Sequence, residues 1–352
     1  MPAKNAAALA GPWDRAVQVW LYLVAGLVFL MIVVGGTTRL TDSGLSITEW
    51  KPILGAIPPL NDAAWHEAFA KYREIPEYHL VNKGMSLEAF KFIYWWEWSH
   101  RFLGRFIGVA FALPFICFLA MGKLRPRLGL KLAGVLALGA LQGAVGWLMV
   151  KSGLVDRVDV SQYRLALHLS IAFLILGFLL WLAFDLEGGG KKRARALISA
   201  GQTRFAGVIA ALVFVQVMLG ALVAGLKAGL AYNTWPLMDG ALVPEGLAAL
   251  SPWYLNFFEN VTTVQFNHRL VAYAVAALVL WQAWDLRRTL SHTAQSRSAA
   301  WLAVAVMCQV MLGIWTLLAA VPLWLGLFHQ AGAAIVLGLA VRHLHGCVRA
   351  GA

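Results

Sequence analysis

The sequence has few charged residues, and this scarcity limits the kind of protein that it can encode. Only 13% of its 352 residues are Asp, Glu, Lys or Arg, whereas 60% are hydrophobic, and the mean hydropathy is +0.69. Soluble domains carry about 25% charged residues. The composition therefore excludes an ordinary soluble domain and indicates a polytopic membrane protein.

Cysteine is also scarce, and its placement excludes several metal and redox sites. The three cysteines, Cys117, Cys308 and Cys347, lie within or beside apolar runs, and no CxxC or CxxCH motif occurs. A zinc ribbon, a covalently attached c-type haem and an outer-loop disulfide are therefore not expected. The first sixteen residues lack the pattern of a cleavable signal peptide, so we expect the first apolar run to remain as a helix.

Eight apolar runs are long enough to cross about 30 Å of hydrocarbon, which takes roughly 20 helical residues. Backbone polar groups in lipid must be paired within the segment, so each run is expected to be a helix. The expected spans are 17–36, 102–121, 132–150, 165–184, 205–224, 268–284, 299–320 and 322–341.

Basic residues set the expected orientation of these spans. With the amino terminus inside, the inner segments hold 16 of the 29 Lys and Arg but only four of the 17 acids, so the whole net charge of +12 lies on one side. This asymmetry follows the positive-inside rule and puts both termini in the cytoplasm. It also relates the basic residues to the lipid bilayer, with no need for nucleic acid as a partner.

The chain contains an internal duplication. Residues 28–45 (VFLMIVVGGTTRLTDSGL) align without gaps with residues 213–230 (VFVQVMLGALVAGLKAGL), an offset of 185 that later Trp, Gly and Pro positions keep. SHRFLGRFIGVA resembles NHRLVAYAVA, and LQGAVGWL resembles CQVMLGIW. Matched polar positions are hard to explain by shared hydrophobicity alone, so the repeat indicates two related halves.

The predicted fold is therefore an all-α integral membrane protein with eight transmembrane helices in two tandem four-helix bundles. Four helices in each half give both halves the same orientation, so a pseudo-twofold axis along the membrane normal relates them. The expected boundaries are 1–187 for the N-terminal half, 188–199 for a basic inner linker and 200–352 for the C-terminal half.

Four histidines occupy equivalent places near the outer ends of even-numbered spans. An ionisable residue at membrane depth is costly and is a functional candidate, although a hydrogen bond to a neighbouring helix explains any single case. Two facing imidazoles can supply both axial ligands of a haem iron, so we predict that His100 pairs with His168 and His268 with His329. The other five are expected to be solvated: His66, His79, His292, His343 and His345.

The two halves differ beside the first histidine of each pair. Glu97 precedes His100 by three residues, whereas Gln265 takes that place before His268. A carboxylate there can accept protons or stabilise positive charge on a substrate. We therefore expect chemistry in the first half and a permanent haem for electron transfer in the second. An ion pair between Glu97 and Arg101, one helical turn on, is the competing interpretation.

Arginines beside the histidines are candidate partners for haem propionates, because a guanidinium group binds a carboxylate through two hydrogen bonds. Arg101 and Arg269 follow the paired histidines directly, and Arg39 and Arg164 are weaker candidates. Snorkelling of the side chains toward the interface explains these positions equally well.

These segments resemble one family, haem A synthase of the type found in alphaproteobacteria and mitochondria. The resemblance covers nearly the whole chain and is carried by GGTTRLTDSGLSITEWKPILGAIPPL, by FKFIYWWEWSHRFLGR and by the repeated histidines. It implies an enzyme that oxidises the C8 methyl group of haem O to a formyl group by successive hydroxylations, which gives haem A for cytochrome oxidase. It also implies that Glu97 is catalytic, that His100 and His168 hold the substrate, and that His268 and His329 hold haem b.

The resemblance further implies a multi-pass protein of the bacterial inner membrane, with haem sites toward the periplasmic side. Haem O synthase is the expected source of the substrate, and the cytochrome oxidase assembly machinery is the expected recipient of the product. The electron-transfer partner is unidentified, and a homo-oligomer is one open arrangement. Some bacterial members carry cysteine pairs in the outer loops; here those loops have none.

Two other functions remain as alternatives at this point. A di-haem cytochrome b that passes electrons between quinol and a partner predicts two permanent haems and no need for Glu97. A transporter or haem chaperone predicts broken helices and polar residues near the bilayer midplane, whereas the ionisable residues here cluster at the outer ends.

Overall fold

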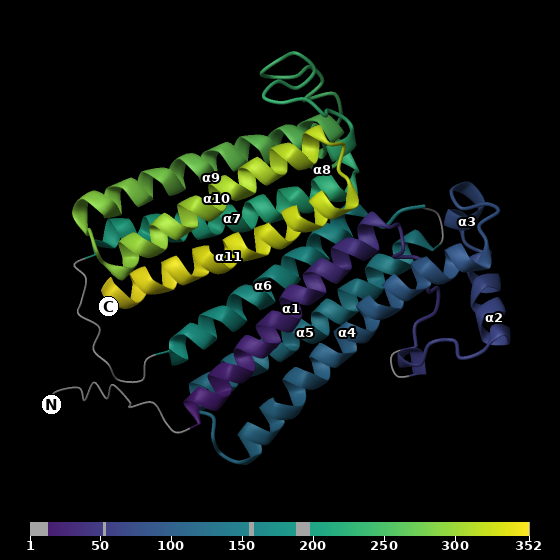
Figure 1. Cartoon of the computed structure of the whole chain (residues 1–352), viewed down its shortest axis with the longest axis horizontal. Coiled ribbons are helices and arrows are strands. Elements are labelled where there is room, and N and C mark those ends of the chain that lie inside the picture. Colours follow the sequence, from purple (N-terminus) through teal and green to yellow (C-terminus); the bar gives the residue numbers. More distant parts are fainter. Residues whose placement is uncertain (1–12, 52–53, 155–157, 188–197, 352) are drawn as a thin grey trace.

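Long helices running side by side make up nearly the whole molecule (Figure 1). The computed structural model describes residues 13–51, 54–154, 158–187 and 198–351. Within these residues eight helices are long and apolar enough to cross a membrane, as predicted, and no strand forms. They are α1 (Asp14–Leu40), α4 (Leu87–Ala120), α5 (Pro126–Gly153), α6 (Gln162–Leu186), α7 (Ala200–Gly225), α9 (Val261–Thr289), α10 (Ala294–Leu318) and α11 (Leu323–Gly351).

Each predicted span coincides with one of these helices, and the largest difference is at the start of α4. The helix begins at Leu87, well before the apolar run at 102. Ser86 caps its first turn by accepting a hydrogen bond from the backbone N–H of Ala89 at 3.2 Å. Glu97 and His100 therefore lie inside one continuous helix and share a face, as their three-residue spacing requires.

The first outer segment folds over the end of the first bundle. It contains η1 (Leu54–Ala56), α2 (Asp62–Tyr72) and α3 (Pro76–Leu80), which project beyond the long helices in Figure 1. The side chain of Phe90 in α4 is fully buried and lies 4.9 Å from the ring of Phe69 and 5.2 Å from that of Tyr72. This aromatic packing explains why α4 is longer than its apolar run.

The long helices form two groups that follow the order of the sequence. In the first half α1 packs on α4 and α6, and α5 packs on α4 and α6. In the second half α7 packs on α9 and α11, and α10 packs on α9 and α11. Between the halves α1 contacts α11 and α6 contacts both α7 and α11. The equivalent helices are α1 and α7, α4 and α9, α5 and α10, and α6 and α11. Each of these contacts between two helices has a counterpart between their equivalents, which fits the predicted pseudo-twofold axis.

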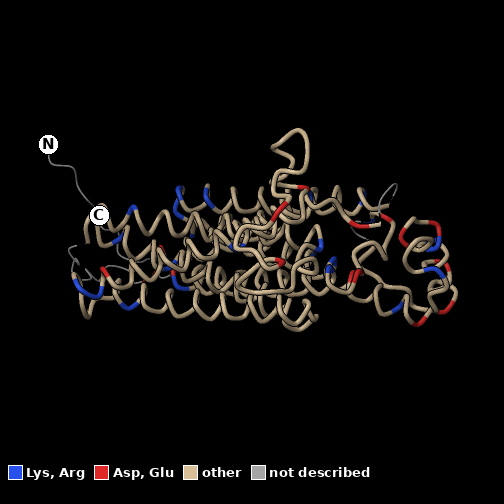
Figure 2. The backbone as a smooth tube through the Cα atoms, turned by 90° about the horizontal axis from the view of Figure 1, so that it is seen from above, with Lys and Arg blue, Asp and Glu red and all other residues tan. Residues whose placement is uncertain are grey.

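Charged residues lie mostly at the two ends of the helices. Figure 2 shows most of the acidic residues near the end that carries α2 and α3, while Lys and Arg dominate the end that carries the C-terminus. The start of α1 and the end of α11 lie at the same end of the molecule (Figure 1). The predicted basic linker, 188–199, falls largely outside the described residues.

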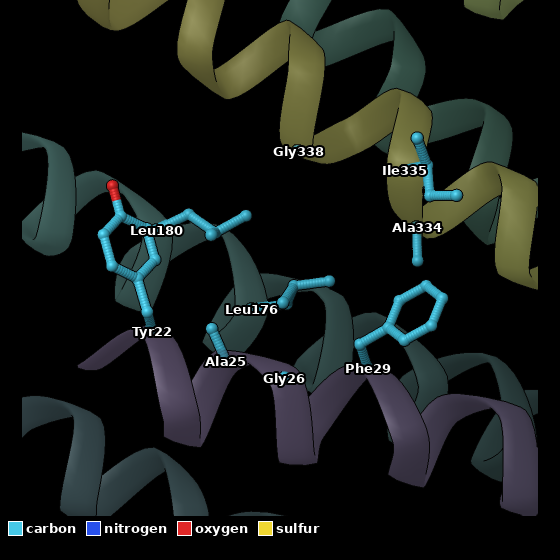
Figure 3. A pocket seen from close by; sticks show the side chains of 9 residues that line it. All are labelled: Tyr22, Ala25, Gly26, Phe29, Leu176, Leu180, Ala334, Ile335 and Gly338. Atoms are coloured by element: carbon cyan, nitrogen blue, oxygen red, sulfur yellow. The ribbon is translucent and has the colours of Figure 1, made fainter. Parts of the chain in front are cut away.

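Part of the contact between the halves is apolar, midway along the helices. A cavity of about 230 Å³ lies there and is lined by residues from α1, α6 and α11 (Figure 3). Phe29 and Gly26 of α1 face Leu176 of α6 and Ala334 of α11 across it. Close approach of α6 and α11 occurs at Gly338, where an added Cβ would lie 3.3 Å from Leu180.

The expectation that all five remaining histidines are solvated is wrong for two of them. His66, His79 and His292 are exposed, but His343 and His345 are 1% and 7% exposed. Helix α11 continues to Gly351, so both residues lie on a packed helix and not in a tail. His343 contacts Ser298 Oγ through Nδ1 at 2.8 Å, and His345 contacts Asp185 at 3.1 Å. These partners satisfy the buried rings.

Candidate functional site

The structure brings the four predicted histidines together as two pairs. His100 on α4 faces His168 on α6, with ring centroids 6.4 Å apart and ring planes at 70°. His268 on α9 faces His329 on α11 at 6.5 Å and 77°. Each pair joins the second and fourth long helices of its half, and the two pairs have nearly the same geometry.

The spacing within each pair suits two ligands on opposite sides of one metal ion. A metal–imidazole bond is about 2.0 Å long and a ring nitrogen lies about 1.2 Å from the ring centre, so two such ligands have centroids about 6.4 Å apart. The distances in the two pairs, 6.4 and 6.5 Å, agree with this value. Two imidazoles on opposite sides are the axial set that a haem iron takes, so the residues present fit that group.

A glycine on a neighbouring helix lies against each of the four rings. A Cβ added to any of these glycines would come within 2.7 to 3.1 Å of a ring atom, closer than side chains normally approach. The contacts are Gly35 with His100, Gly146 with His168, Gly220 with His268, and Gly313 with His329. Gly35 and Gly220 are 185 positions apart, so the duplication preserves this close approach.

Three of the four rings also contact a glutamine that lies four residues before the glycine. The distances are 3.2 Å from Gln142 Nε2 to His168 Nε2, 3.0 Å from Gln216 Nε2 to His268 Nδ1, and 3.1 Å from Gln309 Nε2 to His329 Nδ1. A metal-binding imidazole is oriented by an acceptor that takes its other ring N–H, and a glutamine amide supplies such an acceptor in its Oε1. At His100 the equivalent position, four residues before Gly35, is Met31, whose thioether is only a weak acceptor.

A cavity of about 590 Å³ lies in the first half beside His100 and His168. Its lining extends from Val24 and Leu179 deep in the bundle to Arg39 and other charged residues at the outer end. This volume falls within the range of small-molecule sites, about 300–1,000 Å³. Apolar walls with a charged mouth suit an amphiphilic ligand.

Glu97 lies in the wall of this cavity and is only 2% exposed. Its Oε2 accepts hydrogen bonds from Ser46 Oγ at 2.7 Å and from the backbone N–H of Ile47 at 2.6 Å. Its Oε1 accepts a hydrogen bond from the guanidinium group of Arg101. The ion pair that the sequence left open is therefore present, and these donors fix the orientation of a carboxylate that lines the same cavity as the histidine pair.

Gln265 takes the corresponding place in the second half and is also 2% exposed. Its Nε2 donates to the backbone oxygen of Tyr232 at 3.3 Å. Tyr232 stands 185 positions after Ile47, so the glutamine and Glu97 contact equivalent points of their loops. The architecture is shared, and the carboxylate is the part that differs.

Arg101 and Arg269 hold the outer loops against the helices that carry the histidines. Arg101 donates to the backbone oxygens of Ile47 and Glu49 at 2.6 and 3.0 Å. Arg269 repeats this contact with the backbone oxygen of Tyr232 at 2.9 Å. These bonds give both arginines a structural role, and a contact with a propionate stays a prediction for each.

The two weaker arginine candidates differ in position. Arg39 lines the mouth of the cavity and pairs with Asp42 at 3.1 Å and Asp159 at 3.8 Å. Lys227, from the second half, pairs with the same two acids at 3.6 and 3.2 Å. Arg164 donates instead to a backbone oxygen of α5. Arg39 is thus the better placed of the two for an anionic group in the cavity.

Sequence reasoning missed four charged residues that line the cavity: Asp42, Glu77, Arg105 and Asp159. Arg105 lies one turn after Arg101 on α4 and donates to the backbone oxygen of Lys51 at 3.1 Å, and its i+4 spacing was the available signal. Glu77 reaches the cavity from α3 in the outer loop, where no periodic pattern indicated its direction.

Comparison with known proteins agrees with this arrangement. The family of cytochrome oxidase assembly proteins matches residues 18–341. The chain belongs to that family. It is 53% identical to a protein named heme A synthase from Parvibaculum lavamentivorans over 345 residues, which cover 98% of each chain. It is 55% identical to the heme A synthase of a Chelativorans species, over 93% of this chain and 90% of the other.

A further member of this family, the heme A synthase of Nitrosospira multiformis, is 51% identical over 92% of this chain and 91% of its own length. Such coverage spans both halves, both histidine pairs and the outer loops. The family resemblance predicted from the sequence is therefore confirmed.

Proposed function

We propose that this chain is an oxidoreductase that converts the C8 methyl group of haem O to a formyl group by successive hydroxylations, giving haem A for cytochrome oxidase. The names of its relatives support this reaction. The structural observation that carries it is the buried Glu97 in the same cavity wall as the His100–His168 pair, with Gln265 at the equivalent place of the other half.

In the first half, residues 1–187, His100 and His168 bind the iron of the substrate haem from its two sides. Glu97 faces the substrate, and its carboxylate stabilises positive charge that develops when electrons leave the methyl carbon. Ser46, the N–H of Ile47 and Arg101 keep the carboxylate in one orientation, so little reorganisation accompanies the reaction. Arg39 and Arg101 are the first candidates for the propionates, with Arg164 a weaker one.

In the second half, residues 200–352, His268 and His329 hold a permanent haem b, and Arg269 is the candidate propionate partner. Haem b, when bound there, supplies one-electron transfer. Gln265 is uncharged and places no titratable group beside it, which suits a haem that carries electrons and is not itself modified. The basic segment 188–199 joins the halves on the inner side.

The charge distribution supports an orientation with both termini in the cytoplasm and the haem sites toward the periplasm of the bacterial inner membrane. Haem O synthase is the proposed donor of the substrate. The oxidase assembly machinery receives the product.

The identity of the bound haems tests this function against a di-haem cytochrome b. The protein is purified from cells that make haem O, and its pigments are extracted and separated. We expect haem O or haem A together with haem b. Two equivalents of haem b and no other haem would overturn the proposal.

A Glu97→Gln variant tests the role of the carboxylate. We expect haem content close to wild type but at least a hundredfold slower formation of haem A, because the charge is lost while the shape is kept. Glu67→Gln is the matched control, since Glu67 lies on the exposed side of the same outer segment. Unchanged conversion in Glu97→Gln would remove Glu97 from the mechanism.

A further inference from the structure

A second carboxyl group, Glu77, faces the substrate cavity from the outer loop. Glu77 lies on α3, is 3% exposed and lines the same cavity as Glu97. Tyr72 Oη donates to its Oε1 at 3.3 Å, and Asn82 Nδ2 lies 3.4 Å from the same oxygen. Among the residues that the structure describes, its Oε2 has no hydrogen-bond partner. One oxygen is therefore held by the loop, and the other is buried beside the cavity without a hydrogen-bond partner.

The surroundings of Glu77 differ from those of Glu97 in their charge. Arg101, Ser46 and a backbone N–H occupy both oxygens of Glu97. Burial together with the negative charges of Asp42, Glu97 and Asp159 raises the pKa of Glu77 to about 8, against which the hydrogen bond from Tyr72 acts weakly. Glu77 is thus a carboxyl group with high proton affinity beside one that is committed to an ion pair.

We take water as the source of oxygen for the proposed hydroxylations, and oxidation of a methyl group to a formyl group then releases protons as well as electrons. Each two-electron step removes two protons, one of them from the O–H of the attacking water or of the intermediate alcohol. These protons must leave a cavity whose depth is apolar. A group with a pKa near the working pH is the most effective acceptor.

We propose that Glu77 is the proton acceptor of the substrate cavity: its free Oε2 takes the proton released from water or alcohol oxygen and returns it to solvent at the cavity mouth. In this step the oxygen–hydrogen bond of water breaks and the Oε2–H bond of Glu77 forms, and no electron moves. This role rests on the proposed function.

The geometry provides an exit for that proton. Asp42 lines the same cavity, and its side chain is 51% exposed, so the cavity reaches solvent at that point. Protonated Glu77 passes its proton to water at this mouth and is ready for the next step. Tyr72 and Asn82, which contact each other at 2.8 Å, both hold Oε1, so Oε2 is the oxygen that remains to take a proton.

The test compares Glu77→Gln with wild type in membranes supplied with haem O, from about pH 6 to about pH 9. The wild-type rate of haem A formation should rise with pH through about 8, because the ionised carboxylate is the form that accepts a proton. Glu77→Gln should keep its haems, react at least tenfold more slowly and lose this rise. Glu77→Asp should keep the rise at a reduced rate, and Glu67→Gln should match wild type.

A wild-type rate and pH profile in Glu77→Gln would overturn the inference. Loss of haem from Glu77→Gln would overturn it as well, because glutamine has the shape of the protonated carboxyl group and a proton acceptor is not required for binding. Wild-type protein that forms no haem A at any pH would instead refute the proposed function, so the two failures are distinguishable.

Discussion

A methyl group added at Gly313 tests whether His329 holds a haem. A Cβ at this position would lie 2.7 Å from Cε1 of His329, whereas ordinary contact begins near 3.4 Å. The ring must therefore move by about 0.7 Å, while metal–ligand distances tolerate about 0.2 Å. Without a haem the ring is the end of a flexible side chain and can move at little cost. The damage should therefore fall on haem binding and not on folding.

We expect Gly313→Ala to retain haem b at least tenfold more weakly than wild type, which corresponds to about 1.4 kcal/mol. The measurement is haem b per protein after purification, with the thermal midpoint of the haem-depleted chain as the check on folding. Gly207→Ala is the control, because its added Cβ would lie at an ordinary 3.9 Å from Leu344. Equal haem b content and equal spectra in the two variants would refute the assignment of His329 as a ligand.

Three further predictions follow from the same contacts. Gln309→Leu removes the amide beside His329, and a 10- to 100-fold loss of haem affinity is expected in equilibrium titration; unchanged affinity would mean that the amide is not an orienting group. Arg101→Ala leaves the carboxylate of Glu97 buried without its ion-pair partner. The thermal midpoint should therefore fall by an amount equivalent to about 3–5 kcal/mol. A midpoint equal to wild type would contradict the buried ion pair. Burial raises the pKa of Glu77 from 4.5 in the unfolded chain to about 8 in the folded protein, so the folded state binds the extra proton between these values. The free energy of unfolding of wild type should therefore fall by roughly 1.4 kcal/mol per pH unit across that window, and that of Glu77→Gln should not. Parallel curves of thermal midpoint against pH for the two proteins would count against the burial of Glu77.

Much of the architecture could be predicted because it depends on patterns repeated along the chain. Length and hydropathy predicted the eight helices, and the repeated segments around each histidine predicted which histidines correspond. The structure shows that tertiary contacts repeat as well. The backbone oxygens of Ile47 and Tyr232, which are 185 positions apart, accept hydrogen bonds from Arg101 and Arg269 at equivalent places of the two halves. Helices and repeats can be recognised in a sequence because they depend on residues at regular spacings along the chain.

The features that could not be predicted depend on packing between distant segments. Helix α4 begins early because Phe90 packs on an aromatic loop cluster, and that contact is not encoded in hydropathy. His343 and His345 are buried because α11 continues past its apolar run. Glu77 belongs to the cavity only because a short loop helix turns inward, and five residues are too few to show a periodicity.

The glutamine–glycine pattern has one departure, Met31 at the place that belongs to His100, and it lies in the half to which we assign the substrate. A product haem has to dissociate after every turnover, whereas a resident haem has to stay. His168, His268 and His329 each contact a glutamine amide, whereas the equivalent place for His100 holds Met31 with its flexible thioether. Under the proposed function the product leaves from between His100 and His168, so Met31→Gln is expected to slow the release of haem A.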